Sequence, residues 1–193
     1  MKFYSSHTDR LLIKYQLGDL LDKVIVTDFQ WEAKDRITKS KISEIIGVET
    51  DMVTNYSLIV KSLLFYLYDC NKFARDLITG ISDSYSWYIQ SMCYRREGEF
   101  SLARKFQDRV DQLGFYADLH KKVSLRYDLY ARQPMWDPYL LIKEMEMYKF
   151  GERELEPQLK EILRLEWEII FDTCWDKAQA EISEAIKKTD KTL

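Results

Sequence analysis

The chain has 193 residues, of which 46% are hydrophobic and 32% charged, and its formal net charge is −3 at pH 7. A chain of this length buries roughly 70% of its extended surface on folding, so neither disorder nor dependence on a metal or disulfides is expected. With no excess of positive charge, the chain lacks the broad field that attracts nucleic acid or anionic membranes, and nucleic acid is not an expected partner.

Glycine and proline are scarce, with 6 and 3 residues in the whole chain. A β fold needs a turn every ten residues or so, and long helices need far fewer breaks. The composition therefore predicts an all-α fold. No linker-like stretch divides the sequence, so residues 1–193 are predicted to form a single α-helical domain whose residues 187–193 fray.

The first predicted helix is capped by Thr8, and a second begins at Thr27 or Asp28 and passes Ile37. A short helical turn over residues 42–46 ends at Gly47, since glycine commonly terminates helices. Asp51 is predicted to begin a long central helix whose apolar residues continue to residue 67.

Three helices follow in the middle of the chain. Residues 73–78 form a companion helix closed by Gly80, and Asp83 or Ser84 caps the next helix over residues 85–96. After a break at Gly98, residues 101–113 form a further helix that ends at Gly114.

The last helices carry clear start signals. A helix through residues 119–130 stops before Pro134. Asp137-Pro138 pairs a capping carboxylate with proline at the first helical position, and Glu156-Pro157 repeats the signal ahead of the longest helix.

The segment from residue 87 to 110 has the spacing of a tetratricopeptide-type helical hairpin: Trp87, Tyr94, Gly98, Phe100 and Ala103. Residues 67–75 contain a loosely similar turn, but their alanine does not match this spacing. Since a solenoid needs three or more regular repeats, we predict one such hairpin in an irregular helical-hairpin array with no regular solenoid.

Around this hairpin the chain resembles a family of uncharacterised bacterial α-helical proteins with the signature W-H-x-I-M-H-R-R-E-G-D-F-S-N-A-K-Y-W. The resemblance rests on residues 84–104, and residues 63–78 and 165–172 are also similar to parts of that family. Tyr88 and Tyr94 stand at two histidine positions of the signature, so no role of those histidines carries over. The resemblance implies a helical fold and names no activity.

Glu166 is the most unusual candidate residue, because its spacing from Leu163 and Ile170 turns it toward the apolar face of the last helix. A buried carboxylate needs a partner, and Arg95 or Arg96 is the expected one. A structural ion pair is the simpler interpretation. The functional interpretation is a polar pocket built from the residues Trp87, Tyr94, Arg95, Arg96 and Glu166.

Motifs that would support catalysis or cofactor binding are missing from the sequence. The two histidines, His7 and His120, cannot supply a multi-histidine metal site or an evident triad, and there is no glycine-rich phosphate loop. The three cysteines lack CxxC spacing and are expected to be reduced and largely buried. We therefore predict no catalytic, cofactor-binding or metal-binding residues.

Residues 42–56 resemble a helix-turn-helix, with a short helix, a Gly47-Val48 turn and a second helix. The positions that would face DNA include Glu49, Asp51 and Thr54, which supply no positive charge for phosphates. DNA binding through residues 42–56 is therefore the weakest of three functional hypotheses.

The leading hypothesis is a non-enzymatic helical protein that acts through contacts with a protein partner or a second copy of itself. The 13 tyrosines, 9 phenylalanines and 5 tryptophans are explained most simply by a core of large side chains, and the alternative is an exposed aromatic surface for a partner. The aromatic face of the hairpin over residues 87–110 is the contact surface that this hypothesis predicts. The alternative from another class is an enzyme or small-molecule binder with a polar pocket near Trp87, Arg95 and Glu166. No segment is apolar enough to span a bilayer, and a cytoplasmic location is expected.

Overall fold

The computed structural model describes residues 4–13, 28–151 and 157–190, and in this part of the chain every regular element is a helix. The predicted all-α fold is confirmed. The order of the elements is α1 (Ser6–Ile13), α2 (Asp28–Lys39), α3 (Ile42–Ile46), α4 (Asn55–Leu67), α5 (Asn71–Ile78), α6 (Ser84–Glu97), α7 (Phe100–Gln107), α8 (Phe115–Ser124), α9 (Asp128–Ala131), α10 (Pro138–Lys149) and α11 (Pro157–Asp190).

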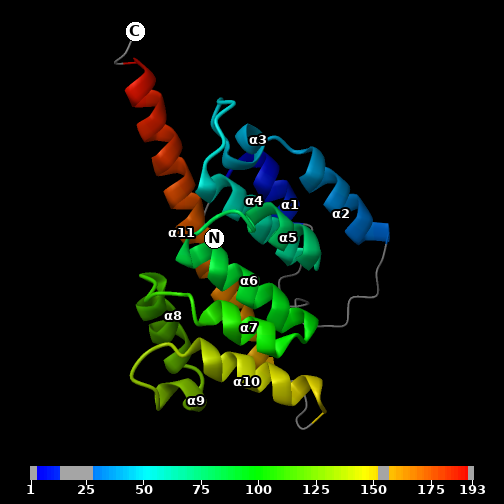
Figure 1. Cartoon of the computed structure of the whole chain (residues 1–193), viewed down its shortest axis with the longest axis vertical. Helices are drawn as coiled ribbons and strands as arrows, with labels where there is room; N and C mark the ends of the chain where they lie inside the picture. The colour runs from blue at the N-terminus through cyan, green and yellow to red at the C-terminus, as the bar shows by residue number, and fades with distance from the viewer. Residues whose placement is uncertain (1–3, 14–27, 152–156, 191–193) are drawn as a thin grey trace.

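Helices α4, α5, α6, α7 and α10 pack one after another, and the long helix α11 runs along the side of this array (Figure 1). Helices α1 to α3 lie at the α4 end, while α8 packs against α11 and α9 packs against α8. Helix α4 contacts α2, α3, α5, α6 and α11, which explains why its sequence is apolar around nearly its whole circumference.

Several helix ends follow the predicted local chemistry. The Asp83 carboxylate accepts from the Tyr85 amide at the start of α6, and the Asp137 carboxylate accepts from the Tyr139 and Leu140 amides at the start of α10. Pro157 is the first residue of α11, whose helix includes residues 187–190. Thr27, Glu156 and residues 191–193, on which parts of the other predictions fall, lie outside the described residues.

Other predicted ends are wrong by several residues. Ser5 rather than Thr8 caps α1, since its hydroxyl accepts from the Thr8 amide. Thr54 rather than Asp51 caps α4, and its hydroxyl accepts from the Ser57 amide. In each case a second hydroxyl or carboxylate nearby in the sequence offers the same capping chemistry, so the sequence alone leaves the choice open.

Two predicted helices are also shorter than expected. Helix α7 ends at Gln107 instead of continuing to residue 113, because the amides of Arg109 and Val110 bond to carbonyls three residues back. The predicted helix over residues 119–130 is interrupted between α8 and α9, where the Arg126 amide makes the same kind of bond to Val123.

The hairpins α4–α5 and α6–α7 are structural equivalents, 29 positions apart along the chain. Ser62 donates to the Ala74 carbonyl at 2.8 Å, and Ser91 donates to the Ala103 carbonyl at the same distance. The expectation that the alanine of the earlier turn does not match is therefore wrong, because Ala74 occupies the place of Ala103. The next helices do not continue the pattern, so the array remains irregular.

The tight turns of the two hairpins use the same backbone conformation with different residues. Gly98 has φ +86° and Asp69 has φ +59°, and the amide of the residue after each bonds to a carbonyl five residues back, at 2.9 Å. This is the left-handed helix end at which glycine is favoured. Asp69 adopts it while its carboxylate binds Arg96 and accepts from the Asn71 amide group.

Replacing Gly98 with alanine is expected to lower the free energy of unfolding by about 1–2 kcal/mol, because a β-carbon is unfavourable in the left-handed region. The added carbon would also lie 3.3 Å from Lys149 Cε. Gly80→Ala is the matched control, since its β-carbon would meet nothing within 4 Å. Urea unfolding of both variants measures the difference, and equal stability of the two would contradict the role given to the turn.

Candidate functional site

Glu166 of α11 lies at the centre of a buried polar cluster. Both of its oxygens accept from the Arg95 guanidinium, one of them from Nη1 at 3.2 Å, and the Tyr88 hydroxyl donates to Oε1 at 2.6 Å. The Trp136 indole donates in turn to the Tyr88 oxygen at 3.1 Å. Glu166 is 0% exposed and Arg95 2% exposed, so the ion pair has no direct access to solvent.

Helix geometry explains how these groups meet. Tyr88 and Arg95 are seven residues apart on α6 and therefore project from the same face, two turns apart. That face of α6 points at α11. The spacing of Glu166 from Leu163 and Ile170 on α11 predicted that Glu166 is turned inward and paired with an arginine. This pairing is observed in the structure, with Arg95 as the partner.

Burial and charge fix the protonation states in the cluster. Burial opposes the charge on Arg95, but the adjacent Glu166 carboxylate outweighs that cost and raises the pKa of Arg95 above its ordinary value. Burial, together with the charge of Glu166, raises the pKa of Tyr88 well above its ordinary range. Tyr88 therefore stays a neutral donor, and the Glu166 carboxylate has strong donors on both oxygens.

The other predicted members of this pocket lie elsewhere. Tyr94 stacks on Phe106 of α7, with ring centroids 5.3 Å apart, and the Arg75 guanidinium lies 4.4 Å from the Tyr94 ring. Trp87 is half-buried. It lies seven residues before Tyr94 and so on the same face of α6, which is a different face from the one that carries Tyr88 and Arg95.

Arg96 also turns away from Glu166. Its Nε lies 2.9 Å from the Asp69 carboxylate, and Nη1 donates to the Tyr66 carbonyl at 2.6 Å. Of the five predicted residues, the structure brings together only Arg95 and Glu166.

Sequence reasoning missed Tyr88, Trp136 and Tyr130 as members or neighbours of the cluster. Tyr130 stacks on Trp136 with ring centroids 5.0 Å apart, and its buried hydroxyl has no hydrogen-bond partner among the described residues. The seven-residue spacing of Tyr88 and Arg95 was the available signal. Nothing comparable marked Trp136, which precedes a helix that packs on α6 and α7.

The three cysteines differ in accessibility. Cys93 and Cys174 are buried, and burial raises the pKa of Cys93 to about 12 and that of Cys174 well above its ordinary value. Cys70 is half-exposed, and its pKa is raised as well, chiefly by burial. All three thiols are therefore protonated near neutral pH.

We expect a thiol reagent such as iodoacetamide to modify the native protein at Cys70 alone, slowly, and faster as the pH rises toward the thiol pKa. Cys93 and Cys174 should react only after addition of denaturant. Peptide mass mapping identifies the modified residue, and rapid native labelling of Cys93 would show that this part of α6 opens readily. A Cys70→Ser variant supplies the unlabelled control.

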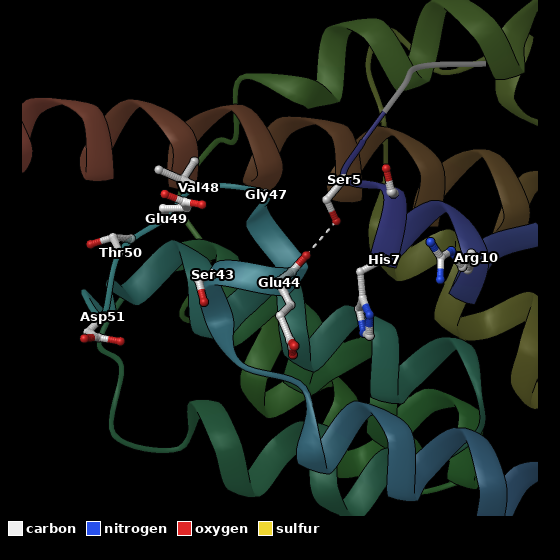
Figure 2. A pocket seen from close by; sticks show the side chains of 11 residues that line it. Ser5, His7, Arg10, Ser43, Glu44, Gly47, Val48, Glu49, Thr50 and Asp51 are labelled. Carbon is white, nitrogen blue, oxygen red and sulfur yellow. Dashed lines mark hydrogen bonds between the residues drawn. The ribbon is translucent and has the colours of Figure 1, made fainter.

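A cavity of about 750 Å³ opens between α1 and the segment after α3. Figure 2 shows Ser5, His7 and Arg10 on one side and Glu44 and Asp51 on the other. The Ser5 hydroxyl lies 2.8 Å from the Glu44 carbonyl and 2.7 Å from the Ile45 carbonyl. The charged groups that line this cavity are of both signs, so no class of ligand is favoured.

Gly47 permits the close approach of the chain at this cavity. It has φ +75°, and a β-carbon there would lie 2.9 Å from Ser5 Cβ. His7 shares a 2.7 Å hydrogen bond with Ser40, whose hydroxyl also lies 2.7 Å from the Arg36 carbonyl. Since the Ser40 proton is given to that carbonyl, His7 acts as the donor to Ser40 and does not activate it as a nucleophile.

A smaller cavity of about 270 Å³ lies between α2 and the start of α5. The Lys34 ammonium lies 4.2 Å from the Trp31 ring and 4.1 Å from the Phe73 ring. A lysine lies over both aromatic rings, although Trp31 and Phe73 remain 60% and 42% exposed.

A third cavity, of about 360 Å³, lies between the end of α7, the start of α8 and the start of α10. We call it the aromatic cleft, and six of its lining residues supply its rings and carboxylates: Tyr116, Trp136, Tyr139, Asp108, Asp111 and Asp137. Met135 and Tyr139 are 57% and 42% exposed at its rim, while Trp136 is buried at its inner wall. The cleft thus joins accessible apolar groups to the buried cluster.

The polar groups of the cleft are held in place by hydrogen bonds. The Tyr139 hydroxyl donates to Asp108 at 2.6 Å, and Gln107 donates to the Tyr116 oxygen at 3.1 Å. Burial and the hydrogen bond to Asp108 raise the pKa of Tyr139 to about 12, so its phenol is neutral at physiological pH. These bonds hold the rings of Tyr116 and Tyr139 in one orientation.

The helix-turn-helix interpretation of residues 42–56 is wrong. Helix α3 ends at Ile46 and α4 begins only at Asn55, so the connection is longer than the three- or four-residue turn of that motif. Helix α4, which would have to enter the major groove, is packed among five other helices. Its central position leaves no face free to read base edges.

Comparisons with known proteins give no match: no family model, no curated protein and no solved structure is similar to this chain. No helix among the described residues is both long and apolar enough to cross a bilayer. In the same part of the chain, no three histidine, cysteine or acidic side chains lie together in a way that could hold a metal ion.

Proposed function

We propose that this protein is a non-enzymatic helical module that binds a protein partner through the aromatic cleft. The observation that carries the proposal is the pairing of exposed Met135 and Tyr139 with the buried indole of Trp136 behind them. Tyrosine and tryptophan anchors in a rigid pocket are typical of the energetically dominant part of protein interfaces.

The enzyme alternative has less support. Arg95 and Glu166 satisfy each other in a buried bidentate pair, and neither lines any of the three cavities. A catalytic pair must contact a substrate. The Arg95–Glu166 pair has its hydrogen bonds satisfied internally and has no access to solvent, so its role is in the packing of α6 against α11.

The proposal includes a cytoplasmic location and membership of the bacterial helical family that residues 84–104 resemble. The three free cysteines are compatible with a reducing compartment, where partly exposed thiols such as Cys70 persist. The tetratricopeptide likeness of the α6–α7 hairpin belongs to the same proposal, since tandem helical hairpins commonly present partner-binding surfaces.

Photo-crosslinking tests the proposed surface. With p-benzoylphenylalanine in place of Met135, the full chain should capture a protein from extract of its source cells, and Tyr139→Ala should reduce the yield at least tenfold. The same probe at exposed Lys187 of α11 is the positional control. Equal crosslinking yields at positions 135 and 187, or a yield at position 135 that Tyr139→Ala leaves unchanged, would refute the aromatic cleft as a binding surface.

A further inference from the structure

The lining of the aromatic cleft carries charge of one sign. Asp108, Asp111 and Asp137 contribute three carboxylates, and no lysine, arginine or histidine is among the described residues that line it. Most of its exposed surface is nevertheless apolar, because tyrosine, tryptophan, methionine and proline side chains form its walls. Rings and carboxylates together match an organic cation better than a neutral or anionic group.

Several aromatic rings elsewhere in the described part of the protein are covered by its own cations. Arg75 lies over Tyr94, Arg109 over Phe106, and Lys177 over both Tyr56 and Tyr85. None of the cation–π contacts found in the described part of the chain uses Tyr116, Trp136 or Tyr139. Of these three rings, Trp136 is buried against Tyr130, and Tyr139 is the exposed one, which lies next to the Asp108 carboxylate with no cation of the described residues over it.

We infer that the aromatic cleft binds an arginine side chain of the partner protein, an inference that rests on the proposed function. The planar guanidinium stacks on the rim ring of Tyr139 and donates to the Asp108 carboxylate, which the Tyr139 hydroxyl holds beside that ring. Asp111 and Asp137 add attraction from the two sides of the cleft.

Arginine fits better than lysine for two reasons. Its flat guanidinium can stack on a ring while its edge donates hydrogen bonds to a carboxylate, and it loses less hydration than a compact ammonium when it leaves water. The cleft supplies both contacts through adjacent groups, the Tyr139 ring and the Asp108 carboxylate. A lysine could satisfy only one of them at a time.

The test is a titration of the isotope-labelled full chain with N-acetyl-arginine amide, followed through the indole N–H resonance of Trp136. We expect saturable shifts with the arginine probe, at least threefold weaker binding of N-acetyl-lysine amide, and no binding of the neutral isostere N-acetyl-citrulline amide. Asp108→Asn should weaken arginine binding about fivefold, the effect of losing one partly exposed ion pair. Tyr139→Leu should weaken it by a similar factor.

Matched variants separate this effect from general electrostatics. Asp51→Asn removes the same charge at the α3–α4 connection, and Phe150→Leu changes another exposed ring, so both should bind the arginine probe like the parent protein. Equal binding of arginine and citrulline probes, equal binding of arginine and lysine probes, or equal loss in Asp51→Asn and Asp108→Asn would overturn the inference.

The failure of this inference can be told from failure of the proposed function. A partner that crosslinks at position 135 in a Tyr139-dependent manner, while the arginine probe does not bind, leaves the protein-binding function standing and removes the arginine specificity. Loss of position-specific crosslinking removes the function itself. Capture of a partner whose crosslinked peptide contains no arginine also counts against the inference.

Discussion

Replacing Glu166 with leucine should lower the free energy of unfolding by about 3–5 kcal/mol, because it leaves the Arg95 guanidinium buried without its counter-charge. The Tyr88 hydroxyl loses its acceptor in the same variant. For a chain of this length the loss corresponds to a fall in melting temperature of about 6–20 °C. Thermal and urea unfolding followed by circular dichroism measure it.

The double variant Arg95→Met/Glu166→Leu is the informative partner of this experiment. Removing both charges abolishes the cost of burying them, and well-packed apolar replacements of a buried pair are often neutral or stabilising. We therefore expect the double variant to recover most of the lost stability. If the double variant lost as much free energy of unfolding as the sum of the two single variants, the Arg95 and Glu166 charges would not be compensating each other's burial, and this interpretation would be contradicted.

Glu184→Gln supplies the control on the same helix. Glu184 pairs with Lys188 four residues along, and both side chains are largely exposed. Removing this pair should leave the melting temperature unchanged, since exposed i,i+4 pairs are screened by solvent. The contrast between the two glutamates of α11 thus depends on burial and not on the loss of a carboxylate as such.

The pairing of Glu166 shows what the sequence could predict. Its position between Leu163 and Ile170 is a local property of a helix, and local periodicity fixes which face a residue occupies. The caps at Asp83 and Asp137 were predictable for the same reason. Each depends on atoms within three or four residues of one another, and no tertiary contact is needed to form it.

The remaining members of the cluster depend on contacts across the fold. Trp136 reaches Tyr88 over a separation of 48 residues, which depends on how the segment before α10 packs against α6. The equivalence of the two hairpins was hidden because matching positions carry different residues, such as Asp69 and Gly98 at the turn. The aromatic cleft is assembled from three segments, and no sequence pattern links Asp108 with Tyr139.

Trp167→Ala is expected to lower the free energy of unfolding by about 3–5 kcal/mol, because it opens a large cavity in the core where α11 packs against α4. Trp167 is 2% exposed and stacks on Phe171 with ring centroids 4.8 Å apart. Its indole donates to the Leu63 carbonyl at 3.1 Å and thereby ties α11 to the centre of α4. Urea unfolding followed by circular dichroism measures the loss.

Trp31→Ala is the matched control, since it removes the same side chain from a position that is 60% exposed. It should change stability little, because the ring packs mainly against Lys34. Trp167→Phe separates the two contributions of the indole: the ring still fills most of the space, so the remaining loss of about 1 kcal/mol reports the hydrogen bond to Leu63. Equally mild effects of Trp167→Ala and Trp31→Ala would contradict the role given to the packing of Trp167 between α11 and α4.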